Sequence, residues 1–327
     1  MKKVLLLGPT GMLGSAVYNE LKDKYQLVLA LRDPEKIKLL EEKYGGTEKH
    51  RVVSFDASLL YQDFLNKKGY PGEYLENFLK EVGEAGPVRS RPANPVRNTI
   101  SNGAGAAATA ALGRPASNGA DFVINAIGIT IPFSLKDPAM TFFINSAMPH
   151  ILSRVWGEKM IHITTDCSFN GKEGFPYDEN SPKTPVDIYG LSKSLGEPEN
   201  CLTLRTSIIG RELESFTGLL DWFLQQGGRE LTGFSEHYWN GITTKQFGKI
   251  CDKIMENRNE FPKTGIYHVF SNTVSKYEML LEFEKKYKIG CAIKANGENK
   301  LNRTLSTVKN LNVKLNIPSF GQMIDEL

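Results

Sequence analysis

The stretch "KVLLLGPTGMLG", residues 3–14, decides the fold. Its apolar run is short and continuous, which is typical of a strand buried on both faces of a parallel sheet. A glycine ends the run, and "MLGSAVYNELKDK" (12–24) then places apolar residues at helical spacing. The run is too short for the apolar part of a secretion signal. The N-terminus is therefore predicted to form a buried strand, a tight loop and a helix.

The glycines of this loop have a spacing with a chemical meaning. Gly8, Gly11 and Gly14 form a G-x-x-G-x-x-G pattern between the predicted strand and helix. Glycine permits the tight turn and lets backbone N–H groups approach a pyrophosphate at the helix N-terminus. The alternative is that these glycines only allow a tight turn and bind no ligand. In this context the loop predicts a dinucleotide site made of Gly8, Thr10, Gly11, Met12, Leu13 and Gly14.

Strands and helices alternate along the first 210 residues. Further short apolar strands are predicted in "YQLVLALRD" (25–33), "HRVVSFDAS" (50–58), "DFVINAIG" (121–128), "MIHITTDCSF" (160–169) and "LTLRTSIIG" (202–210). Such alternation predicts an α/β fold, a Rossmann-type doubly wound parallel sheet with helices on both faces. Residues 1–210 are expected to form the cofactor-binding domain. Residues 211–327 are more polar and mixed, and are expected to form a smaller C-terminal substrate-binding lobe.

One segment, residues 85–120, interrupts this alternation. It is dominated by Ala, Gly, Pro, Asn, Ser and Arg, and it has no acidic or aromatic residue. Such a composition cannot bury enough apolar surface to offset the entropy of ordering. We expect a disordered surface insertion between a helix, "YLENFLKEVGE" (74–84), and the strand that begins near residue 121. Its four arginines leave open a contact with a phosphate or an acidic partner.

The end of the second predicted strand bears on the choice of nucleotide. An acidic residue there binds the ribose 2′-hydroxyl of NAD, whereas arginine suits the 2′-phosphate of NADP. Arg32 comes first and Asp33 second, so NADP(H) is favoured and NAD(H) remains possible. Asp33 is alternatively the N-cap of a helix that begins at Pro34. Asp56, followed by Ala57, is placed to meet the adenine edge, with a turn-forming role as the alternative.

A tyrosine and a lysine in "YGLSKSLGE" (189–197) form the candidate catalytic pair. Tyr189 and Lys193 are four residues apart and would share one helix face. Asp187, two residues before Tyr189, is a candidate N-cap of that helix. The lysine charge is expected to lower the tyrosine pKa from its ordinary value of about 10. Spacing alone decides nothing, because "YNELK" (18–22) has it too.

The context of the pair comes from "IHITTDCSF" (161–169). Thr165 and Asp166 end a buried strand, at the sheet edge where ligands bind in open α/β folds. A hydroxyl there can orient a substrate carbonyl, although Thr and Asp also cap turns. This context favours Tyr189 and Lys193 as the catalytic pair.

The order of "GPTGMLG", "INAIG", "ITTDCSFNG", "YGLSKSLGE" and "LTLRTSIIG" resembles the extended short-chain dehydrogenase/reductase superfamily, and within it the dTDP-4-dehydrorhamnose reductase family. The resemblance covers nearly the whole chain outside 85–120. It implies Thr165, Tyr189 and Lys193 as catalytic residues, with Tyr189 and Lys193 also contacting cofactor. It also implies a nicotinamide side lined by Asn125, Ala126 and Gly128, and substrate contacts at Thr165, Asp166, Tyr189 and Arg303, to which the stacking side chain Trp239 is added.

The expected activity is an NADP(H)-dependent reduction of a nucleotide-linked 4-keto-sugar, with Tyr189 as the proton donor. The family commonly has an aromatic residue at the position of Cys167, and related dehydratases have a glutamate there. A thiol is no substitute for that carboxylate, so dehydration is not expected. Two alternatives stay open: a sugar-nucleotide epimerase with bound NAD, and a non-catalytic cofactor-binding regulatory subunit.

The composition of this chain of 327 residues limits its possible partners and location. The net charge of +3 does not point to nucleic acid, and no apolar run is long enough to span a bilayer. Four scattered cysteines without Cys-x-x-Cys spacing favour free thiols and a reducing, cytoplasmic location. No obligatory metal is expected, and a homodimer is possible.

Overall fold

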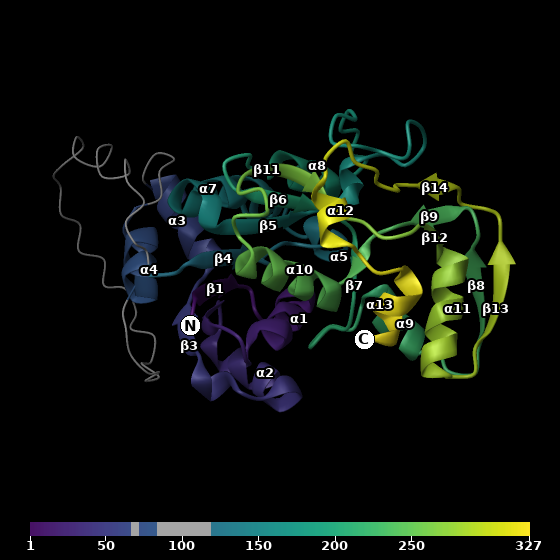
Figure 1. Ribbon diagram of the computed structural model, residues 1–327, viewed down its shortest axis with the longest axis horizontal. Coiled ribbons are helices and arrows are strands. Elements are labelled where there is room, and N and C mark those ends of the chain that lie inside the picture. The colour runs from purple at the N-terminus through teal and green to yellow at the C-terminus, as the bar shows by residue number, and fades with distance from the viewer. Residues whose placement is uncertain (67–71, 84–118) are drawn as a thin grey trace.

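The computed structural model describes residues 1–66, 72–83 and 119–327. Its centre is a seven-stranded sheet in the order β11-β6-β5-β4-β1-β2-β3, in which all neighbouring pairs run parallel (Figure 1). The predicted Rossmann-type parallel sheet is confirmed. Its strands are β1 (Lys3–Leu7), β2 (Gln26–Leu31), β3 (Arg51–Ser54), β4 (Phe122–Asn125), β5 (Met160–Thr164), β6 (Leu202–Arg205) and β11 (Gly265–His268).

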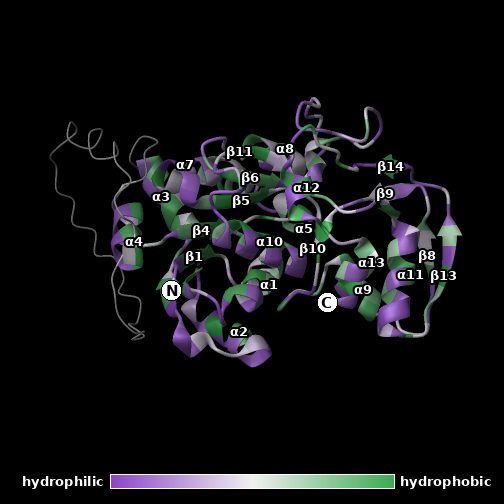
Figure 2. Cartoon of the chain, viewed as in Figure 1, coloured by the Kyte–Doolittle hydropathy of each residue, from purple (hydrophilic) through white to green (hydrophobic). Residues whose placement is uncertain are grey.

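The continuous apolar run of β1 follows from burial on both sides. Successive side chains of a strand point to opposite faces. Val4 and Leu6 therefore join one hydrophobic core, whereas Leu5 and Leu7 join the other, and all four are fully buried. Figure 2 shows the hydrophobic colour gathered on the central strands.

Helices cover both faces of the sheet. Side chains of α1, α2, α10 and α12 pack in the first core, and those of α3, α4 and α7 pack in the second. The bounds are α1 (Met12–Leu21), α2 (Ile37–Tyr44), α3 (Ala57–Asn66), α4 (Glu73–Gly83), α7 (Met148–Trp156), α10 (Thr244–Glu256) and α12 (Leu311–Leu315). The short α5 (Ile131–Ser134), α6 (Pro138–Phe142) and a π-type turn η3 (Phe143–Ala147) lead into α7, and α8 (Ile188–Leu195) lies between β5 and β6.

The strand order reverses at β1, which pairs with β2 on one side and with β4 on the other. Ligands of open α/β sheets bind at such a switch point, outside the carboxyl ends of the strands. The glycine loop after β1 lies at this switch point. The Gly8 N–H donates a hydrogen bond of 3.1 Å to the carbonyl of Ala30.

A smaller lobe follows the sheet and has a core of its own (Figure 1, right). Phe223, Phe283 and Phe320 are fully buried at its centre. The lobe contains α9 (Leu219–Leu224), α11 (Lys276–Tyr287), α13 (Phe320–Asp325) and the strands β8 (Glu230–Phe234), β9 (His237–Trp239), β12 (Val274–Ser275), β13 (Ala292–Asn296) and β14 (Leu301–Asn302). The two-residue strands β7 (Ile208–Ile209) and β10 (Ile242–Thr243) pair with each other between the two parts.

A single cut at residue 210 does not separate these two parts. Strand β11 pairs with β6 in the main sheet, and α10 packs against α1. The apolar side chains of α10 account for this, because Phe247, Ile250 and Ile254 are buried against the first core. The chain therefore returns to the Rossmann part after residue 210 before it completes the lobe.

The predicted insertion, residues 85–120, lies almost entirely outside the described residues. The residues that flank the gap are close in space: a Cβ built on Gly119 would lie 2.5 Å from the Cα of Gly83. Among the described elements, β4 therefore comes next after helix α4, which is the helix-to-strand order that the sequence predicts.

The contact between α1 and α10 depends on a glycine. A Cβ at Gly248 would lie 2.8 Å from Cγ and 3.0 Å from Cβ of Glu20. Helix propensity alone favours Gly248→Val, but overpacking is expected to lower the unfolding free energy by about 1–3 kcal/mol. Urea denaturation measures this. Gly297→Val, where a Cβ would meet nothing closer than 3.9 Å, is the control, and equal stability of the two variants would contradict the packing argument.

Candidate active site

The glycine loop fits a pyrophosphate. Gly8 has a φ of 76°, in the left-handed region, and a Cβ at Gly14 would lie 2.0 Å from the carbonyl oxygen of Gly8. Helix α1, which is described in full, has no side-chain cap and no acidic residue in its first turn. Its first N–H groups therefore stay available to an anion. Thr10, Gly11 and Met12 are accessible, whereas Leu13 and Gly14 are buried.

The end of β2 exposes both Arg32 and Asp33, and the Asp33 side chain also caps a turn. The Asp33 carboxylate accepts a hydrogen bond of 3.1 Å from the N–H of Glu35 and caps the short turn Pro34–Lys36. The alternative reading of Asp33 as a cap is thus confirmed. Lys36 pairs with Glu214 over 2.5 Å. Arg32 is exposed at this strand end.

Asp56 follows β3 and also makes a turn. Its carboxylate accepts a hydrogen bond of 2.7 Å from the N–H of Ser58, at the start of α3. Its own N–H donates to the Tyr74 hydroxyl over 2.5 Å. Ala57, the first residue of α3, is buried. The turn role of Asp56 is therefore observed, and an adenine contact stays a prediction.

The end of β4 is tied to the neighbouring strand. The Asn125 side chain is 1% exposed; its amide lies 3.1 Å from Nδ1 of His162, and its oxygen accepts from the N–H of Ile127. Any cofactor contact at Asn125 and the following Ala126 must then come mainly from the backbone. Gly128 lies next to the candidate lysine, because a Cβ there would lie 2.7 Å from Nζ of Lys193.

The strand end of β5 and helix α8 bring the candidate catalytic residues together. Asp187 caps α8 by accepting from the N–H of Gly190 over 2.7 Å, as the sequence predicts. Thr165 follows β5, and its hydroxyl acts on Tyr189, whose pKa it lowers against the effect of burial. That hydroxyl also lies 3.1 Å from a carboxylate oxygen of Asp166, to which it donates.

The second Tyr–Lys pair is structural. Tyr18 is fully buried, and its hydroxyl donates to the carbonyl of Gly45 over 2.7 Å. It lies on α1 in the first core, and Lys22 pairs with Asp23. Spacing alone therefore did not distinguish the two pairs, whereas position in the fold does.

The expected effect of Lys193 on Tyr189 is not what the structure gives. Burial raises the pKa of Tyr189, the neighbouring Cys167 adds to the rise, and the Thr165 hydrogen bond opposes it. Burial instead lowers the pKa of Lys193 to about 8, against the pull of the Glu197 carboxylate. Loss of solvation outweighs charge pairing for both residues.

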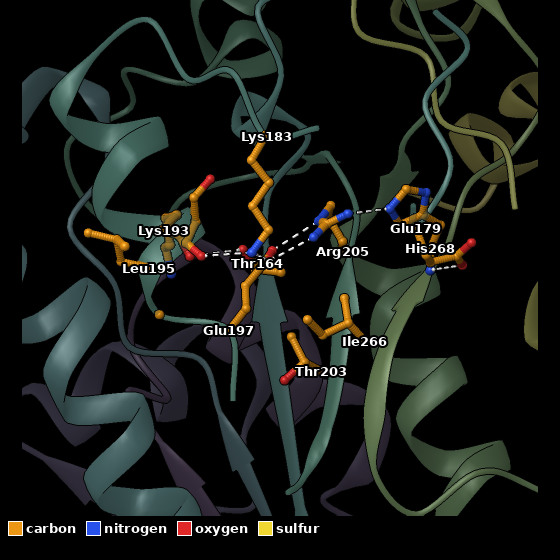
Figure 3. A network of polar contacts seen from close by, with 12 residues as sticks. Thr164, Glu179, Lys183, Lys193, Leu195, Glu197, Thr203, Arg205, Ile266 and His268 are labelled. Carbon is orange, nitrogen blue, oxygen red and sulfur yellow. Dashed lines mark hydrogen bonds and ion pairs between the residues drawn. The ribbon is translucent and has the colours of Figure 1, made fainter. Parts of the chain in front are cut away.

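A buried charge network lies behind α8 (Figure 3). The Arg205 guanidinium holds the Glu197 carboxylate with two hydrogen bonds of 2.9 and 2.7 Å, and a third nitrogen lies 2.6 Å from Nε2 of His268. Lys183 pairs with the same carboxylate over 2.5 Å. Burial acts to raise the pKa of Glu197, but the Arg205 and Lys183 charges outweigh it, so the net pKa is lowered.

Three backbone carbonyls at the end of α8 accept hydrogen bonds from side chains. The last carbonyls of a helix have no partner within the helix, so such donors satisfy groups that would otherwise stay unpaired. The pairs are Ser194 with Lys183 (3.0 Å), Leu195 with His150 (2.8 Å) and Gly196 with His162 (3.0 Å).

The predicted substrate residues lie where the lobe meets the β5 strand end. Asp166 is 8% exposed. Arg303 follows β14 and donates to the Cys167 sulfur over 3.4 Å. Trp239 is buried and packs edge-on against Phe320, which makes it part of the lobe core.

Comparison with known proteins agrees with this geometry. The sequence pattern of the RmlD substrate binding domain matches residues 116–305, more than half of the chain. The chain belongs to the RmlD family. It is a dTDP-4-dehydrorhamnose reductase-like member of the extended short-chain dehydrogenases/reductases.

Curated relatives match over part of their length. The chain is 30% identical over 135 residues to the spore coat polysaccharide biosynthesis protein SpsK of Bacillus subtilis, covering 37% of this chain and 43% of that one. It is 35% identical over 81 residues to a dTDP-4-dehydrorhamnose reductase of Burkholderia thailandensis, covering 24% and 27%. A third match, 29% over 135 residues, is methionine adenosyltransferase 2 subunit beta of Danio rerio, covering 38% and 42%. The chain thus aligns with less than half of each.

Solved structures match the whole fold. A Bacillus anthracis dTDP-4-dehydrorhamnose reductase in complex with NADP has a TM-score of 0.62 at 16% identity, covering 100% of this chain and 98% of that one. A UDP-N-acetylglucosamine 4-epimerase of Methanobrevibacter ruminantium has a TM-score of 0.64 at 12% identity, covering 99% and 96%. At these identities the match establishes the shared fold.

Asn145 is a site residue of this RmlD-family protein that sequence reasoning missed. It lies in the π-type turn η3 and is fully buried. Its side chain binds both the N–H and the carbonyl of Ile129 over 2.9 Å and donates to the hydroxyl of Ser192 over 3.1 Å. It thereby joins the loop around Gly128 to α8. An asparagine inside the apolar helical pattern "TFFINSAM" (141–148) was the available signal.

His237 and Lys276 were missed as well. They belong to β9 and to the first turn of α11. The charges of Lys276 and Arg303 help lower the pKa of His237, and those of Asp166 and Cys167 oppose the fall in the pKa of Lys276. Their sequence neighbourhoods carry no motif, so only the fold brings them to the site.

Other classes of site find no support in the described ranges. Within residues 1–66, 72–83 and 119–327, no three His, Cys, Asp or Glu side chains are grouped to hold a metal ion. No helix in that part of the chain has the length and apolarity to cross a membrane. The four cysteines, all of them in described segments, are free thiols.

Loss of Arg205 from the charge network behind α8 is expected to lower the stability of the protein strongly. Arg205→Met leaves the buried Glu197 carboxylate without its main partner, so the unfolding free energy should fall by about 3–5 kcal/mol. Adding Glu197→Gln should restore part of that loss. Urea denaturation is the measurement. The control is Lys249→Met, which breaks an exposed pair with Glu326 and should cost no more than about 1 kcal/mol. Equal losses for Arg205→Met and Lys249→Met would rule out a structural role for the network.

Proposed function

We propose that this RmlD-family protein is an NADP(H)-dependent reductase of a nucleotide-linked 4-keto-sugar. The observation that carries the proposal is the convergence of Thr165, Tyr189 and Lys193 at the carboxyl edge of the sheet, next to the glycine loop. In this arrangement residues 1–210 supply the cofactor site and the catalytic residues, and the lobe within 211–327 supplies substrate contacts. The reductases and the polysaccharide biosynthesis protein among the relatives support the same substrate class.

The side chains have complementary roles in this reaction. When it is bound in the glycine loop, NADPH supplies the hydride that the carbonyl carbon accepts. The Thr165 hydroxyl orients the carbonyl oxygen. Tyr189, whose pKa burial raises, is protonated at neutral pH and can donate its proton to the developing alkoxide. Lys193, whose Nζ lies beside Gly128, would hold the nicotinamide ribose of a bound cofactor.

Cys167 fits reduction better than dehydration. Burial raises the pKa of its thiol to about 12, so the sulfur stays protonated at neutral pH. It cannot take the place of the second carboxylate that a dehydratase uses. The exposed Arg32 at the end of β2 favours NADP(H), because Asp33 is engaged as a cap.

A second candidate rests on one of the relatives. The methionine adenosyltransferase subunit has a name that assigns it to an assembly with another enzyme. A chain with that role would bind the cofactor and reduce no keto-sugar. The presence of all three catalytic side chains supports the enzyme over the regulatory subunit.

The catalytic proposal is tested by Tyr189→Phe in a screen of nucleotide-linked keto-sugars. Cofactor oxidation is followed by absorbance. Loss of the proton donor should lower kcat by about 100-fold or more, while NADPH affinity changes little. A variant with near-normal turnover would contradict the proposed mechanism. Tyr18→Phe, which alters the structural tyrosine, should keep kcat.

The cofactor proposal is tested by Arg32→Ala. The wild type should prefer NADPH to NADH, and the variant should lose affinity for NADPH by roughly tenfold or more, because a charge-assisted contact with the 2′-phosphate is removed. NADH affinity should not fall. Lys38→Ala, on the neighbouring exposed helix surface, is the control. A wild type that uses NADH alone would refute the role of Arg32.

A further inference from the structure

His162 is a buried histidine that the proposed reaction does not use. It lies on β5, the strand that ends just before Thr165, and it is fully buried. Each ring nitrogen has a partner on an element that is distant in the sequence. Nδ1 lies 3.1 Å from the side-chain amide of Asn125, and Nε2 lies 3.0 Å from the carbonyl oxygen of Gly196. One ring thus joins the end of β4 to the end of α8.

These partners fix which ring nitrogen carries the proton. The side-chain oxygen of Asn125 accepts from the N–H of Ile127 over 3.2 Å, so the NH2 group of the same amide donates to Nδ1 of His162. Nε2 then carries the hydrogen that the Gly196 carbonyl accepts. Burial lowers the pKa of His162 to about 3, so the ring has no charge at neutral pH. A continuous chain of hydrogen bonds therefore runs from the Ile127 backbone to the end of α8.

The two ends of this chain of hydrogen bonds belong to the two segments that meet at Lys193. Ile127 precedes Gly128, where an added Cβ would lie 2.7 Å from Nζ of Lys193. Gly196 ends the helix that carries Lys193, and its N–H donates to the Lys193 carbonyl over 3.1 Å. A shift of Gly196 relative to Ile127 would therefore change the position of the lysine ammonium beside Gly128.

The contact at Gly196 is buried and closely packed. Gly196 itself is buried, and an added Cβ would lie 1.8 Å from the carbonyl oxygen of Asn145, so the backbones of α8 and η3 are in contact. Lys183 and His150, which donate to the two preceding carbonyls, are exposed residues whose place water can take. A buried carbonyl that loses its donor has no such replacement, and the loss is costly. Removal of the His162 donor should therefore displace the end of α8.

We propose that His162 is a positioning residue for the nicotinamide end of the cofactor, and that it acts on Lys193 through the Gly196 carbonyl. Because its ring is fully buried and both nitrogens are engaged, it acts only through its neighbours. The inference rests on the proposed function for a dinucleotide in the glycine loop and for the role of Lys193. Its test measures cofactor binding rather than turnover.

Two substitutions separate the two hydrogen bonds of the ring. In His162→Gln, the side-chain NH2 takes the place of Nε2 and keeps a donor for Gly196. In His162→Asn, the shorter amide replaces Nδ1 alone, and Gly196 loses its donor. Thr203→Val is the matched control, because Thr203 lies opposite His162 in the sheet, is fully buried and donates to the Pro198 carbonyl over 2.7 Å. This control loses a buried hydrogen bond of the same kind outside α8.

The ligands are a dinucleotide and its adenosine half. Affinities for NADPH and NADH are measured by calorimetry and compared with those for 2′-phospho-ADP and ADP, which lack the nicotinamide and its ribose. His162→Asn should bind the preferred dinucleotide at least about tenfold more weakly than Thr203→Val does, because a charge-assisted contact of Lys193 is weakened. Its affinity for the matching adenosine half should stay within about twofold of the wild type. His162→Gln should recover most of the dinucleotide affinity.

A merely structural role for His162 would give a different result. It would weaken the dinucleotide and its adenosine half together, in step with the loss of stability in urea, and that outcome would overturn the inference. So would equal dinucleotide affinities of His162→Asn and Thr203→Val, or a wild type that binds neither dinucleotide.

His162→Gln keeps the test decisive even if His162→Asn does not fold. A tenfold loss of dinucleotide affinity in His162→Gln would place the role of the ring outside its contact with Gly196 and overturn the inference. Absence of keto-sugar turnover leaves these binding results unchanged, so the two proposals fail separately.

Discussion

The end of helix α8 is the constraint on which the site depends. Tyr189 and Lys193 lie on this helix, and its last carbonyls are held by side chains from α7, β5 and the preceding loop. One of these donors, His162, also lies 3.1 Å from the amide of Asn125 at the end of β4. Burial lowers the pKa of His162 to about 3, so the ring is neutral and donates from Nε2 while Nδ1 accepts. The catalytic helix is thereby fixed to two strands of the sheet rather than to a loop.

Burial sets the protonation states around that helix. Tyr189 is kept protonated, and the pKa of Lys193 and Lys276 is lowered to about 8. Lys193 is buried, whereas Tyr189 and Lys276 are partly exposed. Charges that are needed for structure are instead paired, as in the contact of Arg205 with Glu197.

Patterns of residues close together in the sequence made part of the fold and of the candidate site predictable. The glycine loop, the Asp187 cap and the strand ends all depend on residues close together in the chain, and the structure has them where they were predicted. Asn145, His237 and Lys276 were missed because their partners are distant in sequence. The boundary at residue 210 stays a prediction, and nothing in the sequence indicated that α10 and β11, which follow it, pack with the main sheet. That the pKa of Tyr189 is raised could not be predicted, because the burial of its side chain is not visible in any sequence motif.

We propose that Thr165, Tyr189 and Lys193 at the sheet edge support the reduction of a carbonyl by hydride from the bound cofactor. Transfer of deuterium from C4-deuterated NADPH to a nucleotide-linked 4-keto-sugar can be read by mass spectrometry and proton NMR of the product. We expect one deuterium on the former carbonyl carbon, with one equivalent of cofactor oxidised. A product that carries no label, or a rearranged sugar formed without net cofactor oxidation, would contradict it.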